Sequence, residues 1–339
     1  MEYNMQAAVF DGKSINLKSV NKPLINDSQV LIRVKSVGLC GTDIAILKGT
    51  LPTPIPIILG HEFAGDIIRI GDNVDPKWLN KRVTSEINSN IDFNCYYCKK
   101  GKHTQCISRK ALGIDIDGAL AEYIKVDSYL LHEIPNSISY DEATFIEPLA
   151  AAYQIFETMP SDPNEEIMVI FGLGKLGLLI TQVALEKGFN LIVVDSSHKK
   201  LSLAKKLGAQ KLINRFDGPN TVNRIRNITD GLGADIVIDA TGNPIAIKDV
   251  IDSCKTLGKV HLKSTHGIDT PINLTDAIVR EITFYTSRCG PFDKAIEGLN
   301  SGKINVDKLI SKKLALKDIE KAIEFDNITQ DHIKTIIHI

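Results

Sequence analysis

Thiol, imidazole and carboxylate side chains that suit a transition metal stand at separated points in the first half of the chain. Cys40 opens the sequence Cys-Gly-Thr-Asp, His61 and Glu62 lie in Gly-His-Glu, and Glu147 lies in Glu-Pro-Leu. A catalytic zinc takes about three protein ligands and keeps one position open. Cys40 and His61, joined by either Glu147 or Glu62, would meet that requirement. The sequence alone does not show that these residues converge, so the catalytic zinc is a hypothesis at this point.

A second group of thiols lies between residues 95 and 106. Cys95, Cys98 and Cys106 fall within twelve residues, whereas Cys254 and Cys289 stand apart. In a long chain without an export signal, clustered cysteines bind metal more often than they form disulfides. We therefore expect a metal site in this segment, and we interpret Cys254 as a buried packing residue.

A glycine-rich turn in the middle of the chain indicates a dinucleotide site. The apolar run 167–171 leads into Gly172, Gly174 and Gly177, and a helical pattern follows. Gly172 allows a tight turn, Gly174 lets the backbone approach a pyrophosphate, and Gly177 lets the helix lie close to the strand. The free N–H groups at the start of the helix would face the phosphates. The predicted cofactor-binding residues of this turn are Gly172, Leu173, Gly174, Lys175, Leu176 and Gly177.

The acid at the end of the next strand bears on which dinucleotide binds. Asp195 lies 18 residues after the last glycine, where a carboxylate accepts hydrogen bonds from the adenosine ribose hydroxyls. A 2′-phosphate would be repelled there, so we predict NAD rather than NADP. Lys199 and Lys200 would offset part of that repulsion, although we expect them on a solvated helix face. Thr241 and Arg288 are the remaining predicted cofactor contacts.

Charge and hydropathy exclude several classes of function. Lys+Arg 40 against Asp+Glu 41 leaves a net charge of -1, so no basic excess is available for nucleic-acid binding. No apolar run reaches the roughly 18 residues that a membrane span needs. The N-terminus lacks the basic start and apolar core of a signal peptide. We therefore expect a cytoplasmic protein that binds neither nucleic acid nor membrane.

The 339 residues suffice for about two domains, and the pattern of apolar residues changes along the chain. The first third alternates apolar and polar residues in runs such as 30–34 and 63–70, which predicts β-strands. In the middle third, short apolar runs alternate with helical patterns, which predicts an α/β fold with a parallel sheet. These strands are expected at 167–171, 191–194, 236–238 and 259–262. The tail from about residue 287 is expected to hold two helices, the second near 316–326, and a last strand near 334–339.

Taken together, these motifs resemble the zinc-containing medium-chain dehydrogenases over nearly the whole chain. The resemblance rests on CGTD at 40–43, GHEFAGDIIRIGDNV at 60–74, the cysteine segment at 95–106, DGALAEY at 117–123, EPLAAA at 147–152 and the glycine turn at 172–177. It implies a β-rich, GroES-like catalytic domain over 1–149 and 286–339. It implies a Rossmann domain, a doubly wound parallel sheet, over 150–285. It also implies a homodimer or homotetramer joined along the sheet edges of the coenzyme domains.

The resemblance implies a role for each residue of the metal group. Cys40 and His61 match the two ligands that hold the catalytic zinc. Glu147 matches the third position, which is a glutamate in polyol-type relatives and a cysteine in many simple alcohol dehydrogenases. Glu62 matches a nearby acid that approaches the metal as ligands exchange.

Around this group the resemblance implies a proton path and an orienting acid. Thr42 matches the hydroxyl that hydrogen-bonds the substrate oxygen, and Asp43 matches a carboxylate that orients the histidine ligand. Many relatives carry a histidine where this chain has Ala45, at the far end of a proton relay. Protons would therefore leave through Thr42, the cofactor ribose and water, or through water near Glu62 or Glu147.

The cysteine segment matches the structural zinc site of the family with one departure. That site has four cysteines spaced C-x2-C-x2-C-x7-C, and Cys95, Cys98 and Cys106 fit the last three positions. Asp92 stands at the first position, and His103 is a competing fourth ligand. Because carboxylate oxygens also bind zinc, we predict a structural zinc held by Asp92 and the three cysteines. The alternative is a loop that has lost its metal.

The leading hypothesis is a zinc-dependent oxidoreductase that transfers a hydride between an alcohol, polyol or sugar hydroxyl and NAD. Zinc would lower the pKa of the bound alcohol, while the cofactor carries the redox chemistry. Glu147 in place of a cysteine favours polyhydroxylated substrates. Two alternatives stay open: an amino-alcohol or hydroxy-acid dehydrogenase of the threonine type, and a zinc-free relative that either reduces quinones or enones or is a non-enzymatic binding protein.

Overall fold

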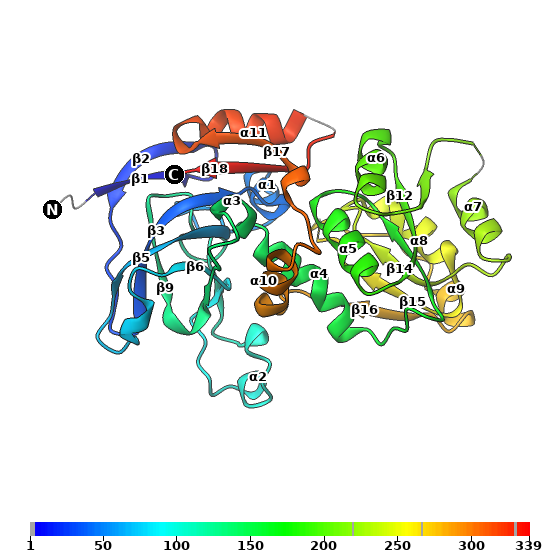
Figure 1. Ribbon diagram of the computed structural model, residues 1–339, viewed down its shortest axis with the longest axis horizontal. Coiled ribbons are helices and arrows are strands. Elements are labelled where there is room, and N and C mark those ends of the chain that lie inside the picture. The colour runs from blue at the N-terminus through cyan, green and yellow to red at the C-terminus, as the bar shows by residue number, and fades with distance from the viewer. Residues whose placement is uncertain (1–3, 219, 266, 329–330) are drawn as a thin grey trace. The chain divides into compact units, whose positions relative to one another are not determined.

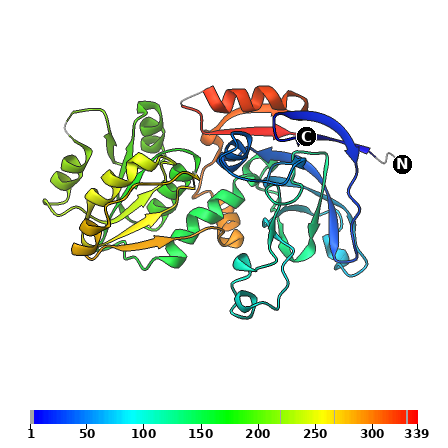
Figure 2. The same ribbon diagram turned by 180° about the vertical axis from the view of Figure 1, so that it is seen from behind.

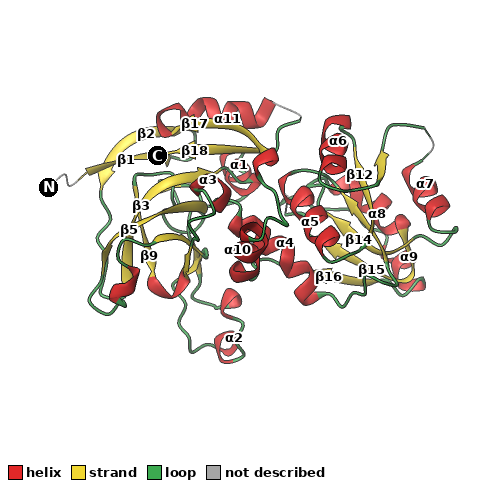
Figure 3. Cartoon of the chain, viewed as in Figure 1, coloured by secondary structure: helices red, strands yellow, loops and turns green. Residues whose placement is uncertain are grey.

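The structure, a computed structural model, describes residues 4–339 except 219, 266 and 329–330. The chain divides into two compact units, one formed by residues 1–147 and 309–339 and the other by residues 148–308. Strands dominate the first unit, whereas strands and helices alternate in the second (Figure 3). The tail of the chain therefore returns to complete the unit in which the chain began.

The first unit is built around antiparallel strands. Its largest sheet has the order β10-β6-β5-β3-β18-β17, with β9 also paired to β3, and smaller sheets have the orders β2-β1-β4 and β7-β8. The strands of this unit are β1 (Asn4–Phe10), β2 (Ile15–Asn21), β3 (Gln29–Gly38), β4 (Ile57–Ile58), β5 (Glu62–Ile70), β6 (Arg82–Ser85), β7 (Asn88–Ser89), β8 (Lys110–Ala111), β9 (Tyr123–Asp127), β10 (Leu131–Glu133), β17 (Ile310–Ala315) and β18 (Lys334–His338). Its helices are α1 (Gly41–Leu47), α2 (Tyr96–Lys99), α3 (Tyr140–Ala143) and α11 (Ile319–Ile328), and α4 (Ile146–Thr158) begins at its boundary.

Strand β3 forms the centre of this unit. Its residues Val30, Ile32 and Val34 are buried, as the period of two along a strand requires for one face of a sheet. On one side β3 pairs antiparallel with β5, and on the other it pairs antiparallel with β18. The sheet thus brings the strand that follows His61 and the last strand of the chain to either side of β3.

A cluster around Asp141 fastens the last two strands to the rest of this unit. The Asp141 carboxylate accepts a hydrogen bond of 2.7 Å from Ser36 Oγ and lies 2.7 Å from the ammonium of Lys313. His338 Nε2 lies 2.9 Å from the same carboxylate. These partners lie on β3, β17 and β18, so one acid on α3 joins three strands that are distant in sequence.

The second unit is a six-stranded parallel sheet with the order β13-β12-β11-β14-β15-β16. Its strands are β11 (Ile167–Phe171), β12 (Asn190–Asp195), β13 (Lys211–Asn214), β14 (Ala234–Asp239), β15 (Cys254–Leu262) and β16 (Thr283–Thr286). Its helices are α5 (Lys175–Glu186), α6 (His198–Lys206), α7 (Thr221–Ile228), α8 (Ile247–Ser253), α9 (Leu274–Val279) and α10 (Phe292–Asn300). Helices cover both faces of the sheet (Figures 1 and 2).

The burial of the strands explains why this sheet is parallel. Every residue of β14, Ala234–Asp239, is buried, and such continuous apolar runs are typical of parallel strands covered on both faces. The expected strands, the two tail helices and the final strand are all present in the structure. The predicted fold, a Rossmann-type doubly wound sheet together with a β-rich unit, is therefore confirmed.

The segment 286–308 packs within the second unit. The backbone of Gly290 lies so close to the Ala150 carbonyl that a Cβ at position 290 would collide with it. The backbone N–H of Asn305 donates a hydrogen bond of 2.7 Å to Gln182 Oε1. The family resemblance assigns this segment to the catalytic domain, and the domain boundaries that it implies stay a prediction.

Within the part of the chain that the structure describes, no helix is both long and apolar enough to span a membrane.

Candidate metal and dinucleotide sites

Cys40 stands at the N-terminus of α1, in the first unit. Its backbone N–H donates a hydrogen bond of 2.8 Å to Asp43 Oδ2, which closes the first turn of the helix. The other carboxylate oxygen, Oδ1, accepts a hydrogen bond of 3.2 Å from the backbone of Gly60. Asp43 is buried, and it thereby ties the residue before His61 to the turn that carries Cys40.

His61 lies next to the same acid. Its Nδ1 is 3.5 Å from Asp43 Oδ1, and it has no hydrogen-bond partner among the described residues. Burial, the largest effect, lowers the pKa of the His61 imidazole, but the Asp43 carboxylate and the Cys40 thiol together raise the pKa well above its ordinary value. A buried imidazole between a thiol and a carboxylate is suited to hold a positive charge, whether a proton or a metal ion.

The structure brings Cys40, His61 and Glu62 together. One ligand atom from each lies within 4.8 Å of the others. Thiolate, imidazole and carboxylate are the donors that zinc prefers, and the buried Nδ1 of His61 lacks a hydrogen-bond partner among the described residues. The residues present therefore fit a zinc ion, and the roles given to the individual residues stay predictions.

Glu62 has a strong partner that the sequence did not reveal. Its Oε2 lies 2.6 Å from the ammonium of Lys334, and both side chains are fully buried. Lys334 also donates a hydrogen bond of 2.9 Å to the carbonyl of Thr144 and lies 4.3 Å above the centre of the Phe145 ring. A Cβ at Gly38 would collide with the Lys334 side chain. The glycine at position 38 therefore leaves the space in which the lysine reaches Glu62.

Glu147 and Thr42 are not part of the group that Cys40, His61 and Glu62 form among the described residues. Glu147 is half-buried in the first turn of α4, and among the described residues it is not part of the group whose ligand atoms lie within 4.8 Å of one another. Thr42 is half-buried in α1, two residues after Cys40. The third-ligand role of Glu147 and the proton-transfer role of Thr42 stay predictions.

The cysteine segment forms a second group of metal-binding side chains. Ligand atoms of Asp92, Cys95, Cys98 and Cys106 all lie within 4.8 Å of one another, whereas His103 is not part of this group in the described chain. Instead, His103 packs edge-on against Phe93, with ring centroids 5.3 Å apart. One carboxylate oxygen and three thiols make a closed four-ligand set that suits structural zinc. Between the two candidates for the fourth ligand, the geometry favours Asp92.

Hydrogen bonds already hold the Asp92 carboxylate. Its Oδ1 accepts hydrogen bonds of 2.8 Å from the backbone N–H groups of Asn94 and Cys95, and Oδ2 accepts one of 3.0 Å from Ser108 Oγ. The two backbone N–H groups are the main reason why the pKa of Asp92 lies far below its ordinary value. Burial raises the pKa of the Cys98 thiol to about 12, so a bound cation would be needed to hold that thiol as a thiolate.

The glycine turn of the second unit has the geometry expected for a dinucleotide site. Gly172 has a φ of 89°, which favours glycine. A Cβ on Gly177 would collide with the Gly172 carbonyl oxygen. Helix α5 begins at Lys175 directly after this turn, so its free N–H groups face the carboxyl end of the sheet. Leu173 is buried and Leu176 is half-buried, so neither offers an exposed side chain to a ligand.

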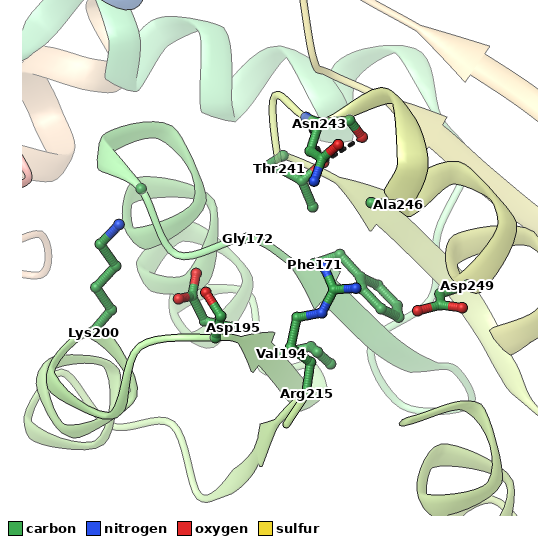
Figure 4. Close-up of a pocket in the computed structure, with 13 residues that line it drawn as sticks. Phe171, Gly172, Val194, Asp195, Lys200, Arg215, Thr241, Asn243, Ala246 and Asp249 are labelled. Carbon is green, nitrogen blue, oxygen red and sulfur yellow. Dashed lines mark hydrogen bonds between the residues drawn. The ribbon is translucent and has the colours of Figure 1, made fainter. Parts of the chain in front are cut away.

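A cavity of about 220 Å³ opens beside this turn. Figure 4 shows Asp195, Lys200 and Arg215 around it, with Thr241 on the side of β14. The residues lining it are Phe171, Gly172, Gly174, Val194, Asp195, Ser196, Lys200, Arg215, Ala240, Thr241, Asn243, Ala246 and Asp249. The size and position of the cavity suit the adenosine half of a dinucleotide.

Asp195 is held in place by the backbone around the cavity. Its Oδ2 accepts a hydrogen bond of 2.6 Å from Leu173 N, and its Oδ1 accepts one of 2.8 Å from Ser197 N. Lys200, which we expected on a solvated helix face, is half-buried and lines the cavity. Sequence reasoning missed Arg215 altogether, because a lone arginine after a short strand carries no motif.

Thr241 and Arg288 follow the carboxyl ends of β14 and β16. Thr241 Oγ1 donates a hydrogen bond of 2.7 Å to Asp239 Oδ1, and the residue lines the cavity. Arg288 is exposed, two residues past β16. Both stand at the edge of the sheet where the glycine turn lies, and their contacts with a cofactor stay predictions.

Comparisons with known proteins show the family of this chain. Residues 26–136 match the family described as alcohol dehydrogenase GroES-like domain, and residues 176–301 match the family described as zinc-binding dehydrogenase. The chain is 33% identical to D-arabitol-phosphate dehydrogenase of Enterococcus avium, over 93% of this chain and 91% of that protein. It is 32% identical to sorbitol dehydrogenase of Bacillus subtilis, over 96% of this chain and 95% of that protein. Among solved structures, a protein of Sinorhizobium meliloti described as a zinc-binding dehydrogenase, bound to NADP, matches with a TM-score of 0.91 and 26% identity over 99% of each chain.

Proposed function

Because the chain belongs to the zinc-containing medium-chain dehydrogenases, we propose that it oxidises a hydroxyl group of a polyol or sugar alcohol with NAD as the hydride acceptor. The observation that carries the proposal is the convergence of Cys40, His61 and Glu62. The relatives named for sorbitol and arabitol phosphate support a polyhydroxylated substrate. The glutamate at position 147, where simple alcohol dehydrogenases carry a cysteine, supports it as well.

We assign the catalytic zinc to Cys40 and His61, with Glu147 or Glu62 as the third protein ligand. When bound, zinc supplies a Lewis acid that lowers the pKa of an alcohol. The ion pair with Lys334 holds the Glu62 carboxylate in its charged form. Asp43 Oδ1 lies 3.5 Å from Nδ1 of His61, and we assign to this acid the orientation of the ring.

The proton released by the alcohol needs a path to solvent. Thr42 is the hydroxyl that we assign to accept it. The position that holds a histidine in many relatives is Ala45 in this chain, and an alanine cannot continue a proton relay. We therefore assign the outward path either to Thr42, the cofactor ribose and water, or to water near Glu62 or Glu147.

The dinucleotide is assigned to the glycine turn and the cavity beside it. Asp195 would accept hydrogen bonds from the adenosine ribose, and its negative charge supports NAD. Lys200 and Arg215 line the same cavity. Their positive charges would reduce the preference for NAD over NADP. NAD remains the proposal, because a 2′-phosphate would meet the Asp195 carboxylate directly.

A second zinc is proposed in the cysteine segment, with Asp92, Cys95, Cys98 and Cys106 as ligands. The support is the four-ligand geometry around Asp92. We assign to it a structural role, because a closed set of four ligands leaves no position for substrate.

We also propose that the protein is a homodimer or homotetramer joined along the second unit. Strand β16 ends the described sheet on one side, and a free strand edge can pair with another chain. The neighbouring helix α9 exposes Leu274, Ile278 and Val279, an apolar surface of the kind that interfaces cover. Light scattering after size-exclusion chromatography tests this, and Ile278→Lys is expected to shift the mass toward the monomer.

Cytoplasmic localisation belongs to the same proposal. In the part of the chain that the structure describes, none of the six cysteines forms a disulfide, as is usual where thiols are kept reduced. Fractionation of expressing cells, followed by immunoblotting, would test it.

A substrate screen tests the proposed activity. Purified zinc-loaded protein is incubated with polyols, sugar alcohols, simple alcohols and L-threonine, each with NAD and with NADP, and the absorbance of the reduced nicotinamide is followed. We expect the highest kcat/KM with a polyol and NAD. Turnover of threonine alone would select the amino-alcohol alternative. Reduction of quinones or enones without alcohol oxidation would contradict the proposal.

A further inference from the structure

A buried lysine holds the turn that follows the last strand of the parallel sheet. Lys263 stands directly after β15, and its side chain is buried. Its ammonium donates hydrogen bonds of 2.9 Å to the carbonyl of Ser287, 2.9 Å to Ser287 Oγ and 3.0 Å to the carbonyl of Arg288. An ammonium has three donors, and each of these three acceptors belongs to the 287–288 segment.

The strands on either side fix this lysine in place. Parallel pairing of β15 and β16 ends with Leu262 opposite Thr286. Lys263 and Ser287 are therefore the first residues after the two strands. The backbone N–H of Lys263 donates a hydrogen bond of 3.0 Å to the carbonyl of Asp239, at the end of β14. The lysine therefore joins three neighbouring strands at their carboxyl ends.

A buried histidine completes the cluster. Nε2 of His261 lies 3.2 Å from Ser287 Oγ, and the ring is fully buried. Burial and the neighbouring Lys263 lower the pKa of His261 to about 4. The imidazole is therefore neutral near pH 7 and adds no second positive charge beside the ammonium.

The place of this cluster in the sheet indicates what it faces. Ligands of open α/β sheets bind outside the carboxyl ends of the strands. The cavity assigned to adenosine is lined by residues that follow β12, β13 and β14. Beyond β14 the same edge continues only through β15 and β16 in the described sheet. A dinucleotide whose adenosine half fills that cavity and whose pyrophosphate lies at the glycine turn must direct its nicotinamide half toward β15 and β16.

We propose that Lys263 is a positioning residue for the nicotinamide half of the cofactor, because it orients the 287–288 backbone and so presents Arg288 to the dinucleotide. The proposal rests on the proposed function, since it assumes that the second unit binds NAD. Because the carbonyls of Ser287 and Arg288 are both directed at one cation, the backbone angles φ and ψ of Arg288, which lie between them, have little freedom to change. The backbone that carries the exposed Arg288 side chain is then ordered before a ligand binds. Less conformational entropy is therefore lost when Arg288 contacts the ligand.

Ligands with and without a nicotinamide test the proposal. The dissociation constant of NADH is measured from its fluorescence, and that of ADP, which lacks the nicotinamide half, by calorimetry. We expect Lys263→Met to raise the Kd for NADH about tenfold, the change for one charge-assisted hydrogen-bond network, and to leave the Kd for ADP unchanged. Equal losses for both ligands, or no loss for NADH, would overturn the proposal.

Lys259→Met is the matched control. Lys259 lies on the same strand, but its ammonium bonds to Glu166 and to the carbonyl of Pro160. We expect this variant to bind NADH and ADP as the wild type does. Arg288→Ala tests the route of the effect: the double variant with Lys263→Met should bind NADH no more weakly than Arg288→Ala alone. Multiplied losses in the double variant would show that Lys263 does not act through Arg288.

A milder variant covers the case in which Lys263→Met does not fold. Ser287→Ala removes one of the three acceptors and leaves the lysine in place, so we expect the Kd for NADH to rise about two- to threefold while that for ADP stays constant. An unchanged NADH affinity in Ser287→Ala would then count against the proposal. A wild-type protein that binds ADP but neither NADH nor NADPH would instead contradict the proposed function.

Discussion

The ammonium of Lys334 lies 2.6 Å from Oε2 of Glu62, and neither side chain is exposed to solvent. The contact joins the last strand of the chain to the strand that begins beside His61. A buried charge is tolerated only when it is paired and hydrogen-bonded. The pair therefore keeps a carboxylate ionised within the group formed by Cys40, His61 and Glu62.

Removing the lysine alone should destabilise the protein strongly. Lys334→Met leaves the Glu62 carboxylate buried without its partner, which costs about 3–5 kcal/mol of unfolding free energy. Urea unfolding of metal-free protein measures this directly. The double variant Lys334→Met/Glu62→Gln should recover part of the loss, because no buried charge remains. Lys312→Met, at an exposed lysine of the same unit, is the control and should change little. If the double variant is less stable than the single one, the pairing argument is wrong.

The catalytic metal should depend on Cys40 and His61. We expect Cys40→Ser and His61→Ala to lower the zinc content from about two ions per chain to about one and to abolish turnover, because a catalytic site has only about three protein ligands. Elemental analysis and the NAD-linked assay check both effects. Cys254→Ala serves as control, since this thiol is buried away from both groups. Wild-type zinc content and activity in Cys40→Ser would refute the assignment.

The structural metal should depend on Asp92 and not on His103. Asp92→Ala is expected to lose about one zinc per chain and to lower the melting temperature, because it opens a closed ligand set. Asp92→Cys should keep the metal, and His103→Ala should keep it as well. Elemental analysis of the three variants separates the candidates. Loss of zinc in His103→Ala, with retention in Asp92→Ala, would make the histidine the ligand.

Cofactor preference should follow Asp195. In Asp195→Ser the carboxylate that would repel a 2′-phosphate is gone, whereas Lys200 and Arg215 remain beside the cavity. We expect the ratio of kcat/KM for NAD to that for NADP to fall about tenfold or more. Asp72→Ser, at an exposed acid of the other unit, should leave the ratio unchanged. A constant ratio in Asp195→Ser would argue against the role of this acid.

Asp141 should make stability depend on pH. Burial acts to raise the pKa of this carboxyl, but hydrogen bonds and ion pairs with Lys313, Ser36 and His338 lower it overall. When the pKa is lower in the folded state than in the unfolded state, where it is about 3.9, the ionised carboxylate adds to the unfolding free energy at any pH above that value. This contribution is lost as the pH falls through the lowered pKa of the folded state.

Asp141→Asn should therefore cost about 1 kcal/mol of unfolding free energy near neutral pH. The difference from wild type should shrink once the pH falls below about 4, where the native carboxyl takes up its proton. Urea unfolding at a series of pH values provides the measurement. A difference that stays constant down to the acid limit would show that the charge of Asp141 is not responsible.

Much of the second unit could be predicted from the sequence, because its signals are local. The run 167–171, the glycines after it and Asp195 lie within one short segment, and each has a direct physical reason for its residue type. The cysteine segment is equally compact. In these segments, residues that lie close together in the sequence also lie close together in the structure.

The contacts that depend on distant segments could not be predicted. Lys334 stands in an ordinary strand with no motif, and its partner Glu62 is 272 residues away. Lys263 and Arg215 are likewise single cations without a pattern. Their partners are set by the order of strands in a sheet, which the identity of the residues does not reveal.

Gly38 extends the consequence of the Lys334 pair to a third position. A Cβ there would collide with the end of the Lys334 side chain, so a substitution at 38 requires either a shift of the lysine away from Glu62 or a shorter residue at 334. A shorter, uncharged residue at 334 would leave the buried Glu62 carboxylate without its ion-pair partner, unless residue 62 also became neutral. Gly38, Glu62 and Lys334 lie on three different strands, and we expect a substitution at one of them to change the cost of substitutions at the other two.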